Sequence, residues 1–122
     1  MKRNALMGLT IAILLLATAG VAPAGVKHGS RISMGYSPAA GGQFTGKVRS
    51  AAGCADRRKV VVFRARSGPD AAVGRTTSSS GGGWRLRTGT PQAGDYYAQA
   101  TAQSRAGGVR CGGARSALTH VS

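Results

Sequence analysis

The sequence predicts an all-β fold, a sandwich of about seven strands held by one disulfide, and three observations support this prediction. Beyond the N-terminal leader, no window repeats apolar residues with the spacing of an amphipathic helix. Short alternating or β-branched runs instead lie between frequent glycines, a pattern typical of β-sandwiches and barrels. The two cysteines, the third observation, allow a single cross-link.

The leader has the three parts of a secretory signal peptide, a positive start, an apolar stretch and small residues before the expected cleavage after Ala24. Cleavage after Ala19 is an alternative. An uncleaved membrane anchor is the competing interpretation, but the apolar stretch has about 17 residues, and a spanning helix needs roughly 20. We therefore expect export, with a secretory signal peptide over 1–24, a flexible N-terminal tail over 25–31 and one β-sandwich domain over 32–122.

The charge of the exported part is strongly positive. Two of the seventeen basic residues lie in the leader, which leaves fifteen against three aspartates and a formal charge of +12. Such a charge favours anionic partners, among them phosphate polymers of a cell envelope, acidic polysaccharides, lipid head groups and nucleic acid. Coding bias in a GC-rich genome is the alternative origin of this arginine-, alanine- and glycine-rich composition.

In an exported chain, Cys54 and Cys111 are expected to form a disulfide. The chain-entropy model gives the long loop between them a stabilisation of about 4 kcal/mol. A metal site and a catalytic thiol are the alternatives, and a zinc site is the weaker one because two cysteines without paired histidines or further cysteines make a poor ligand set. We expect no metal and no cofactor.

The expected strands alternate between a core side and a solvent side. The strongest is 58–66, in which Val60 and Val62 point to the core while Val61 and Phe63 point the other way. The serine- and glycine-rich segment 78–83 is interpreted as the tip of a hairpin. The expected strands cover residues 31–36, 43–50, 58–66, 72–77, 84–88, 95–103 and 115–121.

The expected core is thin, because many of its positions are alanine or glycine. Trp84, the only tryptophan, is expected to contribute most, since an aromatic side chain buries about 150–250 Å². The expected core residues are Phe44, Val48, Val60, Val62, Val73, Trp84, Leu86, Tyr96, Ala98, Ala100 and Leu118.

Five motifs in order, at 44–48, 58–64, 73–77, 83–86 and 94–98, resemble small secreted bacterial domains of the transthyretin-like or carboxypeptidase-regulatory-like type. The resemblance implies an Ig-like or prealbumin-like Greek-key sandwich with a non-catalytic accessory or binding role. It also suggests that Tyr96 forms a tyrosine corner, with its hydroxyl bonded back to the main chain. The alternative for Tyr96 is a plain core aromatic.

No enzyme is expected. The lactam-hydrolysing branch of the transthyretin-like group relies on paired histidines, an arginine and a C-terminal Tyr-Arg-Gly-Ser, whereas this chain ends in Thr-His-Val-Ser. The three acids, Asp56, Asp70 and Asp95, lie at expected turns without a second acid nearby. His120 is the sole candidate for a Ser-His-Asp site, and a surface position is the simpler interpretation of it.

The basic residues are the remaining candidates for a functional site. Arg57, Arg58 and Lys59 cluster at the start of an expected strand. Another set alternates with core residues, so it would form a basic stripe if the two strands neighbour each other; its members are Lys47, Arg49, Arg85 and Arg87. A solvated face that keeps the domain soluble is the alternative interpretation.

We therefore expect a secreted or envelope-associated module that binds anionic envelope polymers through basic outer faces. Nucleic acid is an unlikely partner, because only Phe63 and Tyr97 could stack on bases. The alternative is a secreted effector or inhibitor that docks on an extracellular protein through 78–83. An exposed apolar rim around that segment would favour the alternative.

Overall fold

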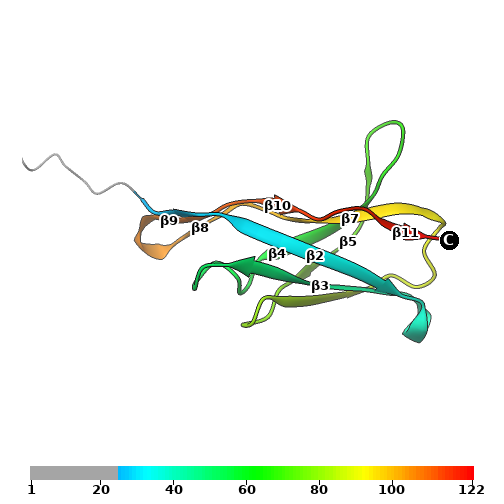
Figure 1. The fold of residues 1–122 in the computed structure, drawn as a ribbon, viewed down its shortest axis with the longest axis horizontal. Helices are drawn as coiled ribbons and strands as arrows, with labels where there is room; N and C mark the ends of the chain where they lie inside the picture. The colour runs from blue at the N-terminus through cyan, green and yellow to red at the C-terminus, as the bar shows by residue number, and fades with distance from the viewer. Residues whose placement is uncertain (1–24) are drawn as a thin grey trace, which may run out of the picture.

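The computed structural model describes residues 25–122, and the expected signal peptide over 1–24 lies outside the described residues. The described part is mostly β-structure with two short 3₁₀ helices, η1 (Ala39–Gly41) and η2 (Ala106–Gly108). Its strands form two facing sheets and a small third sheet at one end of the molecule (Figure 1). The prediction of an all-β chain with one disulfide is confirmed.

Each sheet pairs two consecutive strands and adds at least one strand that is distant in sequence. The first sheet has the order β2 (Ser30–Ser37), β3 (Gln43–Ser50) and β6 (Gly83–Arg87). The second has the order β10 (Ala114–Arg115), β7 (Gly94–Ala100), β4 (Lys59–Arg64) and β5 (Ala71–Thr77), and β11 (Thr119–Val121) also pairs with β7. The small sheet has the order β1 (Lys27–His28), β9 (Val109–Cys111) and β8 (Gln103–Arg105).

The core lies between the two large sheets. Both sheets contribute to one buried cluster, made of Ile32, Phe44, Val48, Val60, Val62, Trp84, Tyr96, Ala98, Ala100 and Val121. Leu86 is partly buried and packs against this cluster. The indole of Trp84 lies over Gly46, where a Cβ atom would approach the ring to 2.7 Å. A glycine on β3 therefore gives the large aromatic ring of β6 its space.

Two residues expected in the core are exposed instead. Val73 is 39% exposed because a β-bulge leaves it without a partner on β4. On either side of it the pairing continues, with Gly74 opposite Val62 and Ala72 opposite Phe63. Leu118 is 57% exposed because it lies between β10 and β11, where the chain leaves the sheet.

The chain ends also differ from the prediction. The expected tail over 25–31 is not free, since β1 pairs in parallel with β9 and β2 already begins at Ser30. The expected last strand is split into β10 and β11 around Ser116. There the Ser116 N–H donates to Ala98 O at 2.8 Å and its Oγ accepts from Ala98 N at 2.9 Å, so a side chain replaces part of the ladder.

The segment over 78–83 is not a hairpin tip. It connects two different sheets, because β5 pairs with β4 and β6 pairs with β3. Ser78 is buried, and its Oγ accepts from Arg58 N and donates to Ala55 O. Gly82 O accepts from Val48 N at 2.8 Å, which ties the segment to β3.

Candidate functional site

The outer surface of the first sheet carries five basic side chains, which we call the cationic face. The exposed side chains of this face are those of Arg31, Lys47, Arg49, Arg85 and Arg87. Because β3 pairs with β6, the stripe expected from Lys47, Arg49, Arg85 and Arg87 lies on adjacent strands of one sheet. Arg31, which was not among the expected site residues, joins it from β2.

Strand periodicity places these side chains outward. Phe44 and Val48 on β3, like Trp84 on β6, are buried, and the basic residues occupy the positions between them. Arg31 stands directly opposite Arg49 in the β2–β3 ladder. Like charges directly opposite each other on a sheet are destabilising, so this pair costs stability unless an anion lies nearby.

None of the three acids of the chain belongs to this face. The Asp56 carboxylate accepts from Arg57 Nε at 3.3 Å, and the Asp95 carboxylate lies 2.9 Å from His120 Nδ1. Asp70 lies in the turn before β5 and accepts from Tyr97 Oη at 2.5 Å. All three carboxylates therefore have partners away from the first sheet, and the cationic face has no acid of its own.

Arg58 differs from the expected exposed basic cluster, because its side chain is fully buried. Its Nη1 donates to Ser30 Oγ at 2.9 Å and to Cys54 O at 2.8 Å. Its Nη2 donates to Thr101 O at 2.9 Å and to Gly112 O at 2.6 Å. Burial, and then the charge of Arg105, lower the pKa of the guanidinium. With four acceptors already bonded, Arg58 is unable to bind a ligand.

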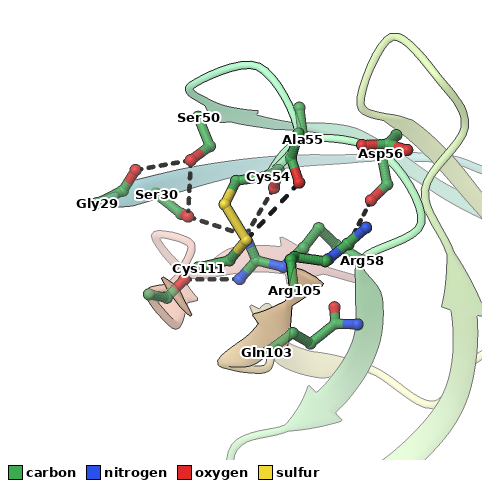
Figure 2. The surroundings of a disulfide bond; sticks show 12 residues. Gly29, Ser30, Ser50, Cys54, Ala55, Asp56, Arg58, Gln103, Arg105 and Cys111 are labelled. Carbon is green, nitrogen blue, oxygen red and sulfur yellow. Dashed lines mark hydrogen bonds between the residues drawn. A yellow bond between two sulfur atoms is a disulfide. The ribbon is translucent and has the colours of Figure 1, made fainter. Parts of the chain in front are cut away.

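The predicted disulfide is confirmed and lies beside this guanidinium (Figure 2). It joins Cys54, in the loop after β3, to Cys111 of β9, with a Cα–Cα distance of 5.4 Å. Both cysteines are buried. The disulfide and Arg58 thus connect the same end of the two large sheets to the small sheet. A disulfide of this kind indicates an oxidising, extracellular-type compartment.

The two neighbours of Arg58 have separate surroundings. The side chain of Arg57 is 79% exposed and pairs with Asp56. Lys59 is exposed and begins β4, on the outer surface of the second sheet. The three consecutive basic residues therefore form no single patch. Only Arg57 and Lys59 are exposed, and they lie in different surroundings.

Aromatic side chains cover part of the outer surface of the second sheet. Phe63 and Tyr97 stack with ring centroids 5.3 Å apart, and the Arg115 guanidinium lies 3.8 Å from the centroid of Tyr97. The hydrogen bond from Tyr97 is the main cause that lowers the pKa of Asp70, followed by the Arg66 N–H. The same bond raises the pKa of Tyr97. Tyr97 is covered, and so it offers no open stacking surface.

The remaining features considered from the sequence are the His120 site, a metal site and a membrane-spanning helix. His120 and Asp95 stand opposite each other on β11 and β7 as an exposed pair. Within residues 25–122, no group of three His, Cys, Asp or Glu side chains gathers as a metal site would require. The same part of the chain contains no helix long and apolar enough to cross a membrane.

The segment 78–83 lacks the apolar rim that docking on a protein would favour. The exposed large apolar side chains of the described residues are Val26, Val73 and Leu118, and all lie outside this segment.

No family model, curated protein or solved structure matches this chain. The candidate site is therefore interpreted from its own geometry and charge, and the cationic face is its principal feature.

Proposed function

We propose that this protein is an exported, non-enzymatic module that binds phosphate-bearing polymers of the cell envelope through the cationic face. The observation that carries the proposal is the set of five exposed basic side chains on one sheet without an acid among them. Keeping Arg31 opposite Arg49 is unfavourable for the free protein, and a polyanion offsets this cost.

The composition of the face supports phosphate as the preferred anion. Four of its five cations are arginines. The guanidinium presents a planar fork of donors that matches phosphate oxygens, and it is more weakly hydrated than an ammonium group. Side chains on the same side of a strand repeat every two residues, about 7 Å apart, and neighbouring strands lie about 4.8 Å apart. This flat grid suits a flexible chain of repeated negative charges.

We further propose that the domain is an Ig-like sandwich, as the resemblance to transthyretin-like and carboxypeptidase-regulatory-like domains implies. The sheet orders β2-β3-β6 and β10-β7-β4-β5 support this assignment. The Tyr96 hydroxyl donates to Gln92 O at 2.5 Å, four residues upstream, as a tyrosine corner does. Export and attachment to the envelope rest on the leader, the charge and the disulfide together.

The test compares two triple variants that lose the same charge. The variant Lys47→Gln/Arg85→Gln/Arg87→Gln changes the cationic face, and the control Lys27→Gln/Arg66→Gln/Arg110→Gln changes exposed basic residues outside it. Binding of the oxidised protein to immobilised long-chain polyphosphate is measured at low and high salt. At about 1 kcal/mol per basic residue near an anionic surface, the face variant should bind about 100-fold more weakly at low salt.

The control should lose less than the face variant at low salt, and at about 0.15 M salt it should stay within about threefold of the unchanged protein, since screening then leaves only a small general charge effect. Equal losses in both variants would show that total charge alone attracts the polymer, and the cationic face would have no special role. Equal binding to hyaluronan, a carboxylate polymer, would remove the preference for phosphate. Tighter binding to single-stranded DNA of equal charge would point to nucleic acid instead.

A further inference from the structure

The opposite outer surface of the molecule contains a cleft that the cationic face does not include. The cleft has a volume of about 400 Å³ and is lined by Lys59, Val61, Arg75, Thr76, Thr77 and Thr101. We call it the Lys59 cleft. It lies on the second sheet, where Lys59 and Val61 alternate with the buried Val60 and Val62. Across the sandwich the core separates the cleft from the cationic face, and at the β5–β6 edge a neighbouring hollow that shares Thr76 and Thr77 with the cleft extends to Arg85.

Two basic side chains flank the cleft. In the β4–β5 ladder, Lys59 stands opposite Thr77 and Val61 stands opposite Arg75, so Lys59 and Arg75 are diagonal neighbours on one face. The Cβ atoms of diagonal neighbours are about 7–8 Å apart or less, within reach of two long side chains. Both side chains are exposed, and among the ion pairs of residues 25–122 neither takes part.

The floor and walls of the cleft add chemistry that the cationic face lacks. Val61 is half-buried and forms an apolar floor between the two cations. Thr77 and Thr101 bring hydroxyl groups to the rim. Asp56, three residues before Lys59, pairs with Arg57, and Asp70 is engaged with Tyr97 and Arg115 at the Phe63 end of the sheet. The cleft therefore combines two cations outside the ion pairs, hydroxyl donors and an apolar surface, and no acid is among its lining residues.

We propose that the Lys59 cleft is a second phosphate site, which makes the protein bivalent for the polymer. The proposal rests on the function proposed above. A phosphate group of the polymer lies between Lys59 and Arg75, and any apolar part of the repeating unit lies over Val61. Because facing sheets are about 10 Å apart and the outward side chains of the two sheets point in opposite directions, a segment that lies flat on the cationic face does not occupy the cleft. The protein therefore bridges two segments or two chains.

Bridging has a thermodynamic consequence that simple binding lacks. Once one surface is bound, the second binding event occurs at a high effective concentration when another segment is within reach. A bivalent protein should therefore cross-link polymer-coated particles at intermediate protein concentrations and release them at a large excess, when each surface binds a separate protein molecule.

The experiment separates binding from bridging. Polyphosphate-coated beads are titrated with the full oxidised protein, and bound protein and bead aggregation are measured in the same samples. The variant Lys59→Gln/Arg75→Gln should still bind through the cationic face, with the lower affinity of a single site, while aggregation at equal bound protein should fall at least tenfold. The charge-matched control Lys27→Gln/Arg110→Gln should keep both.

Chemical shifts provide a second readout that does not depend on aggregation. Phenyl phosphate is titrated into the protein with labelled valine methyl groups, and the Val61 methyl signals are followed. Saturable shifts that disappear in Lys59→Gln/Arg75→Gln would support the site, and tighter binding of phenyl phosphate than of inorganic phosphate would support the apolar floor. Equal shifts in the variant and the unchanged protein would overturn the site.

The outcomes distinguish this proposal from the function on which it rests. If the protein binds the beads and never aggregates them, or if Lys59→Gln/Arg75→Gln aggregates them normally, the second site is wrong and the cationic face remains. If the unchanged protein does not bind polyphosphate at all while its Val61 signals still shift with phenyl phosphate, the polymer function is wrong and the cleft is a small-anion site.

Discussion

At the scale of single residues, Arg58 shows how a basic side chain becomes structural. Isolated buried charge is unfavourable, but each terminal nitrogen of Arg58 donates two hydrogen bonds, and the acceptors come from four separate segments. Three of these acceptors are backbone carbonyls. The guanidinium therefore holds the loop of Cys54, the end of β7 and the segment after β9 together.

Replacing Arg58 should be strongly destabilising. Arg58→Met removes the donors and leaves the buried acceptors without partners, which we expect to lower the free energy of unfolding by about 3–5 kcal/mol. Arg58→Lys keeps the charge but supplies only one nitrogen, so it should recover part of this loss. Urea unfolding followed by Trp84 fluorescence measures both.

Arg57→Met provides the matched control for Arg58. The Arg57 side chain is 79% exposed, so this change should alter stability by less than about 0.5 kcal/mol. A loss for Arg58→Met no larger than for Arg57→Met would contradict the structural role of the buried guanidinium.

Asp70 should make stability depend on pH. Its pKa is lowered in the folded protein, chiefly by the hydrogen bond from Tyr97, so the contribution of this carboxylate is present above the unfolded pKa of about 3.9. That contribution is lost as the pH falls through the lower folded pKa. The stability difference between the unchanged protein and Asp70→Asn should shrink between about pH 5 and pH 2. Thermal unfolding across this range measures it, and a difference independent of pH would refute the assignment.

At the scale of strands, β3 has two different sides that depend on each other. Its outward residues contribute to the cationic face, and its inward residues pack in the core. Gly46 belongs to the inward side, and a Cβ atom there would collide with Ser33 O as well as with the Trp84 ring. The placement of β6, and with it Arg85 and Arg87, depends on this close contact.

Gly46→Ala should therefore disturb β6 more than a glycine substitution in open space. We expect a loss of about 1–3 kcal/mol in the free energy of unfolding, typical of overpacking, and a shift of the Trp84 emission as the indole moves. Gly35→Ala is the control, since a Cβ atom there meets nothing within 4 Å. An unchanged Trp84 spectrum in Gly46→Ala would show that the neighbours accommodate the methyl group without moving the ring.

At the scale of the whole molecule, the disulfide stabilises a small domain with a modest core. It spans 57 residues and joins the small sheet to the loop after β3. Since typical domains have only about 5–15 kcal/mol of stability, a cross-link of this loop length is a large contribution.

Removing the disulfide should cost about 4 kcal/mol by the chain-entropy model. The variant Cys54→Ala/Cys111→Ala is compared with the oxidised protein by urea unfolding. The fully reduced unchanged protein should be destabilised by a similar amount, which separates the loss of the bond from the loss of sulfur packing. A double variant as stable as the oxidised protein would show that the sheets and Arg58 are sufficient without the bond.

What the sequence determined by itself is local. Alternation along 43–50 and 84–88 follows from the two-residue period of a strand, so the inward Phe44 and the outward Lys47 were both predicted. The pairing of Cys54 with Cys111 follows from having two cysteines. The strand in which Val60 and Val62 are buried was predicted from its β-branched residues.

Tertiary structure decided which strands meet and which charges are covered. The pairing of β5 with β4 and of β6 with β3 depends on contacts between distant segments, and no local pattern separates it from a β5–β6 hairpin. The same holds for Arg58, which looks like its basic neighbours in sequence. Its acceptors at Ser30, Cys54, Thr101 and Gly112 come together only in the folded chain, and burial is a property of that assembled environment.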